Sequence, residues 1–188
     1  MILRSATGLV LFLVVVVMLS LPAAAKSRDP IRFVRGETME QQIFVQIAGM
    51  TLEKSEFKVT YVDIDLTNRT EAMASGVAHV FLEFPVTDAK DALAAARKKR
   101  RVRVLGGRLR NGRNEATLKV VWEGMQAKWP YAIKVIKTMT FPNDELRALA
   151  ARASAEGLSP EAVAANWMAA NVPIWKRWRT ASKNWMTP

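Results

Sequence analysis

Apolar residues in the last third of the chain recur at helical spacing, and residues that start or stop helices separate the runs. Pro130, Asn143 and Ser159 each precede such a run and are residue types favoured at helix starts. Gly157 is placed to end the second run, and Pro173 divides the third run from a fourth. The first run has its apolar face at Ala132, Val135, Ile136 and Met139. The pattern therefore predicts four helices in this tail.

The region before the tail alternates strand-like and helix-like runs. Runs with a period of two predict strands, and runs with a period near 3.6 predict helices. The predicted strands cover 31–34, 57–64, 77–82, 102–104 and 118–122, and the predicted helices cover 39–51, 67–75 and 88–99. Strands that alternate with helices indicate βαβ units. We expect an α/β fold with a mostly parallel sheet, helices on both of its faces and a C-terminal helical tail.

The N-terminal segment has the pattern of an export signal. Arg4 precedes an apolar run from Leu9 to Leu19, and small residues follow at 22–25. The run is shorter than the roughly 20 residues that span a bilayer, so a cleaved signal peptide is favoured over a permanent anchor. An uncleaved anchor would also place the rest outside the cytoplasm. We expect a signal peptide at 1–25 and a single periplasmic or otherwise extracytoplasmic lobe at 26–188.

The chain is strongly basic. Its net charge is +11, which falls to +10 when the signal peptide is removed with Arg4, and it contains no cysteine. The lack of cysteine excludes a disulfide scaffold. An exported protein is not expected to meet nucleic acid, so the charge favours anionic lipids, acidic proteins or an anionic polymer as partners.

The helical tail carries several separate motifs in a fixed order. They read WPYAIKVIK at 129–137, Phe141 with NDEL at 143–146, EGLSPEA at 156–162 and NWM at 166–168. Their order and spacing closely resemble the C-terminal end of glycine betaine, proline betaine and choline substrate-binding proteins, the receptors of ABC importers. The resemblance continues more weakly at 31–36, 57–59 and 74–83. It implies a periplasmic-binding-protein-like lobe, a quaternary ammonium ligand and the membrane subunit of an importer as partner.

The sequence lacks room for one part of such a receptor. The resembled proteins have two lobes joined at a hinge, and their chain leaves the first lobe, builds the second and returns. Here only Gly106 to Asn114 separates the strand near Val104 from the returning strand near Leu118. So short a segment cannot form a lobe. We predict a single-lobe relative whose second lobe is replaced by a short basic turn.

The resemblance places ligand contacts on the loops after the first and third strands. The family holds its cations against aromatic faces, an interaction that acts within about 6 Å of a ring. In this chain the two loops carry Glu37 and Thr38, and Glu83 and Phe84. One hypothesis is that these residues line a reduced ligand site, either weak or completed by a second chain that supplies the missing lobe. The alternative is that they are ordinary loop residues of a domain that no longer binds betaine.

The tryptophans fall into two groups. Core packing is expected for those beside helix starts or on apolar faces, namely Trp122, Trp129 and Trp167. The other three share one stripe of the last predicted helix, among basic residues: Trp175, Trp178 and Trp185. Two interpretations are open for this stripe. The helix either packs on the lobe or presents a docking stripe to a membrane interface or a partner protein.

The densest run of charge lies in the middle of the chain. It comprises Arg97, Lys98, Lys99, Arg100, Arg101, Arg103, Arg108, Arg110 and Arg113. Cations at a helix C-terminus are favourable, which accounts for a few of them but not for the whole run. We interpret the rest as an anion-binding or partner-binding patch, whose attraction is screened beyond about 8 Å at physiological salt.

Catalysis has little support in the sequence. His79 is the only histidine and lies in a predicted strand, where a satisfied core imidazole is expected. There is no nucleophile motif, no phosphate-binding glycine loop and no cluster with metal-ligand spacing. We expect no enzyme, no cofactor and no metal. Two hypotheses remain: a substrate-binding component, or truncated relative, of an ABC importer for quaternary ammonium compounds, and a non-transport module that docks through its basic patch and tryptophan stripe.

Overall fold

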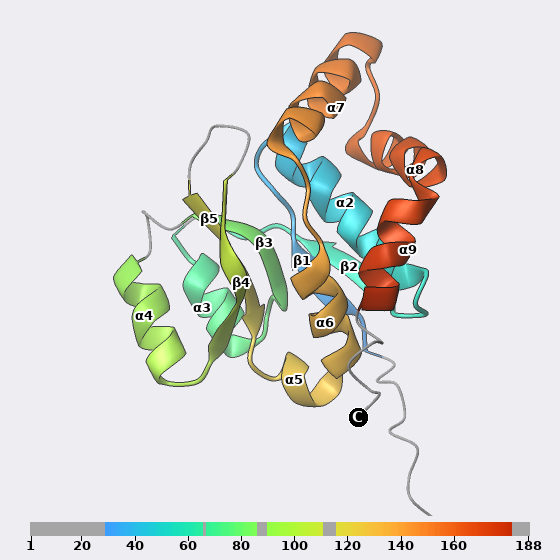
Figure 1. Cartoon of the computed structure of the whole chain (residues 1–188). Helices are drawn as coiled ribbons and strands as arrows, with labels where there is room; N and C mark the ends of the chain where they lie inside the picture. Colours follow the sequence, from blue (N-terminus) through green and yellow to red (C-terminus); the bar gives the residue numbers. More distant parts are fainter. Residues whose placement is uncertain (1–28, 66, 86–89, 111–115, 182–188) are drawn as a thin grey trace, which may run out of the picture.

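The computed structural model describes residues 29–65, 67–85, 90–110 and 116–181 of the 188-residue chain (Figure 1). The predicted signal peptide at 1–25, Arg113 and Trp185 lie outside these residues. Within the described ranges, no helix is both long enough and apolar enough to cross a bilayer. These residues form a sheet flanked by helices (Figure 1).

The sheet has five strands in the order β2-β1-β3-β5-β4. The strands are β1 (Ile31–Val34), β2 (Val59–Val62), β3 (Val80–Pro85), β4 (Val102–Arg110) and β5 (Ala116–Trp122). Strand β1 pairs in parallel with β2 and β3, whereas β5 pairs antiparallel with β3 and β4. Strand β5 therefore runs against the other four. The predicted α/β sheet is confirmed, with this reversal at one strand.

Helices cover both faces of the sheet (Figure 1). On one face lie α3 (Arg69–Ser75) and α4 (Lys90–Lys98), which pack Met73 and Leu93 against Phe81 and Val120. The other face carries a larger apolar cluster, in which α2 (Met39–Glu53) packs with the helices of the tail. The tail comprises α5 (Met125–Lys128), α6 (Pro130–Thr138), α7 (Asn143–Glu156), α8 (Pro160–Ala170) and α9 (Val172–Ala181).

Most predicted helix boundaries in the tail are confirmed, and two are wrong. The Ser159 hydroxyl accepts a hydrogen bond from the Ala162 amide, and Gly157 ends α7 with a left-handed φ of 64°. Asn143 is not the N-cap of α7, because Pro142 occupies that position and Asn143 is the first helical residue. Pro173 does not precede the last helix but lies in its first turn, where a missing amide proton is tolerated.

Strand β3 begins later than predicted. The sequence predicted a strand at 77–82, but β3 spans Val80–Pro85. After α3 ends, the Ala78 amide still bonds back to the Ala72 carbonyl at 3.0 Å. Val80 is the residue that pairs with Phe33 of β1. Residues 76–79 are therefore used to leave helix α3 before the chain joins the sheet.

Strands β4 and β5 form a long antiparallel hairpin in place of the predicted turn at 106–114. Pairing runs from Val102–Trp122 to Arg110–Ala116, so that only residues 111–115 connect the strands. The register shifts between Leu105 and Leu109. Gly106 lies in this irregularity with a φ of 75°, a conformation that glycine adopts readily. The strand continues beyond this glycine, which the sequence had suggested as its end.

Candidate functional site

Glu37 and Thr38, two of the predicted ligand residues, open helix α2. The Thr38 hydroxyl accepts a hydrogen bond from the Gln41 amide, and the Gln41 side chain accepts from the Glu37 amide at 2.8 Å. Gly36, which precedes them in the sequence, packs directly against Gln41: a Cβ added at Gly36 would lie 2.1 Å from the Gln41 Cβ. These contacts fix the loop after β1 as a helix cap. They leave the Glu37 carboxylate outside the capping interactions.

The predicted loop position of Glu83 and Phe84 is wrong, because both lie within strand β3. Glu83 is a buried carboxyl. It is 5% exposed, and its Oε2 has no hydrogen-bond partner among the described residues. Burial raises its pKa to about 7, and the charge of Glu40 in the first turn of α2 adds to the shift. The group is therefore poised between a neutral and an ionised form near neutral pH.

Phe84 lies on the other side of the sheet from the α2 helix. Its ring is fully buried and meets Phe81 edge-on, with 5.3 Å between the ring centroids. The guanidinium of Arg69 lies 6.0 Å from the Phe84 ring and 5.9 Å from the Phe81 ring. An internal cation therefore already occupies these two faces. The ring offers no exposed face to a ligand in this structure.

The structure brings Glu83 close to the start of α2 but leaves little space between them. Gly36, Gln41 and Glu83 line one crevice, together with Val34, Val45 and Phe81. This crevice has essentially no room for a water molecule. A trimethylammonium group would need a wider opening or a surface outside the described residues.

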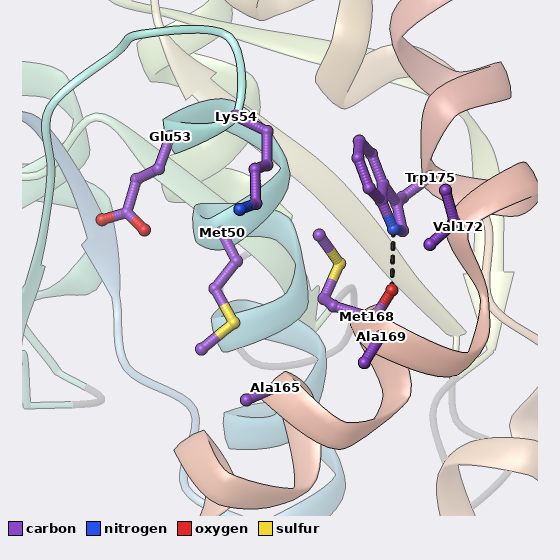
Figure 2. Close-up of a pocket in the computed structure, with 8 residues that line it drawn as sticks. All are labelled: Met50, Glu53, Lys54, Ala165, Met168, Ala169, Val172 and Trp175. Atoms are coloured by element: carbon purple, nitrogen blue, oxygen red, sulfur yellow. Dashed lines mark hydrogen bonds between the residues drawn. The ribbon is translucent and has the colours of Figure 1, made fainter.

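A larger pocket, of about 500 Å³, lies elsewhere, between α2, α8 and α9 (Figure 2). Met50, Met168 and Trp175 line it, and the Trp175 indole donates a hydrogen bond to the Met168 carbonyl at 2.9 Å (Figure 2). Lys176 and Arg179 lie 6.0 and 5.8 Å from the Trp175 ring. The ring is already partnered by cations, so the pocket is poorly suited to a further cation. Sequence reasoning missed it because its walls come from distant segments.

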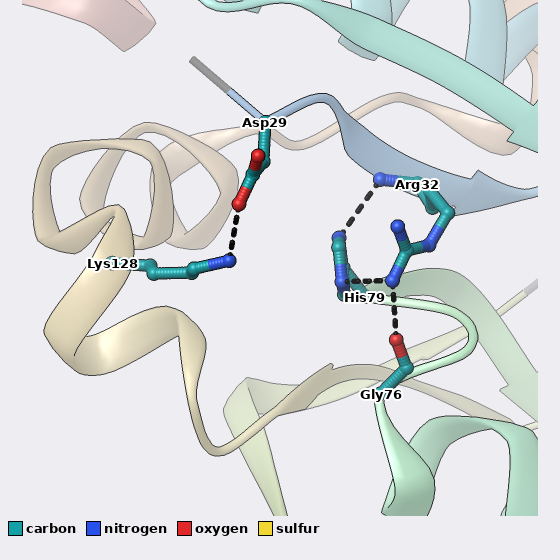
Figure 3. Close-up of polar contacts among 5 residues, drawn as sticks. All are labelled: Asp29, Arg32, Gly76, His79 and Lys128. Atoms are coloured by element: carbon teal, nitrogen blue, oxygen red, sulfur yellow. Dashed lines mark hydrogen bonds and ion pairs between the residues drawn. The ribbon is translucent and has the colours of Figure 1, made fainter. Parts of the chain in front are cut away.

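His79 belongs to a separate cluster of polar side chains, which Figure 3 shows. Its Nδ1 accepts a hydrogen bond from the Arg32 amide at 3.0 Å, and its ring packs against Trp122 and Trp129 with centroids 5.3 and 4.9 Å apart. Burial, reinforced by the charge of Arg32, lowers its pKa to about 4. Nearby, Lys128 forms an ion pair with Asp29 at 2.5 Å (Figure 3). The predicted core position of His79 is confirmed.

The predicted basic patch divides into two parts. Residues 97–101 are all exposed at and beyond the end of α4, and none of their side chains forms an ion pair within the described part of the chain. Arg103 instead pairs with Glu123 at 2.5 Å and bonds Gln126 at 3.1 Å. Arg108 and Arg110 lie on β4.

The predicted docking stripe is wrong for its two described members. Trp175 and Trp178 are 7% and 4% exposed and belong to the large apolar cluster. Trp178 stacks on Trp167 with 5.8 Å between ring centroids, and its carbonyl accepts a hydrogen bond from Thr138. Helix α9 therefore packs against the lobe. Trp175 and Trp178 lie on one stripe of the helix, as their spacing predicts, but this stripe faces inward.

Lys119 is a buried lysine that the sequence analysis did not single out. It is 2% exposed on β5, and its ammonium group donates hydrogen bonds to the carbonyls of Ile136, Lys137 and Met139 at the end of α6. Burial lowers its pKa to about 8. The group caps a helix C-terminus, so its role is structural. In the described residues, no group of three His, Cys, Asp or Glu side chains is placed to hold a metal ion.

Comparisons with known proteins give the family context. Residues 112–170 match the family model described as the substrate binding domain of ABC-type glycine betaine transport system. Lactococcal OpuAC, in a closed form complexed with glycine betaine, has a TM-score of 0.65 and 12% identity, over 80% of this chain and 99% of that chain. An ABC-transporter choline binding protein in complex with choline has a TM-score of 0.69 and 10% identity, over 81% and 92%. The glycine betaine, L-proline-binding protein ProX from Borrelia burgdorferi has a TM-score of 0.67 and 10% identity, over 80% of this chain and 96% of that chain.

The fold places the chain in the class of periplasmic-binding-protein-like α/β lobes. The sequence match over 112–170 agrees with the resemblance predicted from the motifs of the tail: this part of the chain is similar to the substrate binding domain of glycine betaine transport systems. The fold is similar to that of solved glycine betaine and choline binding proteins. At 10–12% identity the solved structures speak for the fold alone.

Proposed function

We propose that the chain is an exported substrate-binding component, or a single-lobe relative of one, of an ABC importer for glycine betaine, choline or a similar quaternary ammonium compound. The match of residues 112–170 to the glycine betaine family model carries this proposal. The chain acts by binding rather than by catalysis. The apolar run and small residues at 9–25 support export by a cleaved signal.

The β4–β5 hairpin supports the proposal that a second lobe is missing. Arg110 pairs with Ala116, so the chain returns within residues 111–115, where the resembled receptors cross to another lobe. The alignments reach across 92–99% of the three neighbours' chains, so this part of the proposal rests on the hairpin and not on coverage.

The ligand site we propose lies between Glu83 on β3 and the start of α2. Glu83 supplies a carboxylate for a ligand cation, and Glu37 adds a second acid on the neighbouring loop. The crevice that Glu83 shares with Gly36 and Gln41 is too narrow to enclose the ligand, which supports a second wall contributed by another chain. Phe84 takes part only if its ring leaves the buried contact with Arg69.

Calorimetry with glycine betaine, choline and proline betaine tests this function. We expect saturable heat and a thermal shift at millimolar ligand. Ligand affinity should rise as pH increases through about 7, because Glu83 then ionises and attracts the cation. The Glu83→Gln variant should lose this pH dependence, while the exposed-acid control Asp91→Asn should keep it. Neither heat nor thermal shift with any of the three compounds would overturn the receptor proposal.

A further inference from the structure

The end of helix α4 is the most concentrated exposed charge among the described residues. Arg97, Lys98, Lys99, Arg100 and Arg101 follow one another along the chain, and all are exposed. None of their side chains has an ion-pair partner in the part of the chain that the structure describes. Their positive charges therefore remain available to attract an anionic partner.

The backbone at this point favours a different residue. Helix α4 ends in a turn in which the Arg100 amide bonds the Arg97 carbonyl and the Arg101 amide bonds the Ala96 carbonyl, both at 2.9 Å. Arg100 has a φ of 51°, the left-handed conformation in which helix ends usually carry glycine. A cation stands here in spite of the backbone preference, which points to a use for the charge.

A groove of about 370 Å³ adjoins the cluster, with one wall from α3 and the other from α4. Lys99 and Arg101 line it together with the threonines at 67 and 70, and Glu71 is the one acid among the described residues of its lining. Hydroxyls beside cations are suited to a phosphate group. Much of the remaining lining consists of alanines, whose side chains are small.

We propose that the α4 end cluster (residues 97–101) docks the protein on a membrane surface rich in anionic phospholipid, with one phosphodiester group seated in the α3–α4 groove. Protein–protein interfaces are anchored by aromatic and large apolar side chains. Val77 is the large apolar side chain exposed in the described residues, and it lies outside this cluster and groove. Cations without such anchors suit a diffuse layer of head groups, each contributing about fivefold to binding.

Vesicle co-sedimentation tests this docking, with phosphatidylcholine vesicles compared with vesicles containing phosphatidylglycerol. The purified protein should bind only the anionic vesicles and dissociate as salt is added. The triple variant Lys98→Gln, Lys99→Gln, Arg101→Gln should bind roughly a hundredfold more weakly. A matched triple variant removes three exposed cations elsewhere, at Lys54, Lys58 and Arg147, and should keep most of the binding.

A second variant keeps the test independent of folding defects. Arg100→Gly removes one charge at a position where glycine fits the backbone, so it should fold at least as well and bind roughly fivefold more weakly. Equal losses in the two triple variants would overturn the proposal, because net charge alone would then explain binding. Failure to bind anionic vesicles at low salt would also overturn it, as would stronger competition by an acidic polypeptide than by vesicles of equal charge. These outcomes do not depend on whether the protein binds a betaine.

Discussion

Phe84 illustrates how a single irregularity redirects a residue. Strict alternation along a strand would place Phe81 and Phe84 on opposite faces of the sheet. The β3–β5 register shifts between these two residues, and both rings join the cluster under α3 and α4. A bulge of this kind depends on the partner strand, so the sequence of β3 alone could not reveal it.

Glu83 makes stability depend on pH. Its pKa is about 7 in the folded protein against 4.5 as the reference, so the folded state holds the proton more tightly. This contribution is fully present below pH 4.5 and is lost as pH rises to 7. The Glu83→Gln variant should therefore gain up to about 3 kcal/mol over the wild type at pH 8, and nothing at pH 4.

Urea unfolding at a series of pH values measures this difference. His79 titrates in the same range with the opposite sign, because its lowered pKa favours the neutral ring and makes stability rise with pH. Only the difference between wild type and variant isolates Glu83. Parallel stability curves for the two proteins would contradict the assignment.

Helix α9 contributes to stability through its buried tryptophans. Trp178 packs on Trp167 and lies 6.4 Å from the Phe141 ring, measured between centroids. Truncation of a buried aromatic residue to alanine typically costs about 3–5 kcal/mol, so Trp178→Ala should lower the free energy of unfolding by that amount. Denaturant unfolding checks it, with Trp178→Phe as the milder control. A loss below about 1 kcal/mol would show that α9 does not depend on this contact.

Elements were predictable where their signals are local. Helices α6 and α8 both begin with a proline in the first turn, at Pro130 and Pro160, and Ser159 also caps α8, so both starts follow from the sequence. The start of β3 and the length of the β4–β5 hairpin depend on pairing with distant strands, and both were misplaced. The inward face of α9 was also undetermined, because a stripe of tryptophans does not say what covers it.

The candidate site also has features that the sequence predicts and features that depend on packing between distant segments. The resemblance located Glu83 and the loop before α2 by their order along the strands, and the structure brings these two together. The narrowness of their crevice and the buried face of Phe84 follow from packing between segments. Lys119 was invisible for the same reason, since its partners on α6 lie 17 to 20 residues away.

The whole lobe should unfold as one unit. The two apolar clusters lie on opposite faces of the same strands, with Val120 in one and the adjacent Val121 in the other. Loss of either cluster exposes the sheet that supports both. We expect a single calorimetric transition whose enthalpy equals the van't Hoff value, as for other single domains of this size. Two resolved transitions, or unfolding without cooperativity, would contradict a stable single lobe.

The β4–β5 hairpin can accept an inserted segment at the connection between its strands. Arg110 and Ala116 are paired neighbours, so a chain that leaves the sheet at one returns beside it at the other. The entropy cost of closing a loop grows only slowly with its length, by about 0.6 kcal/mol per doubling. An insert whose own ends lie close together would leave the pairing from Val102 to Arg110 unchanged. The connection between β4 and β5 is thus a suitable site for inserting another domain, such as a fluorescent reporter.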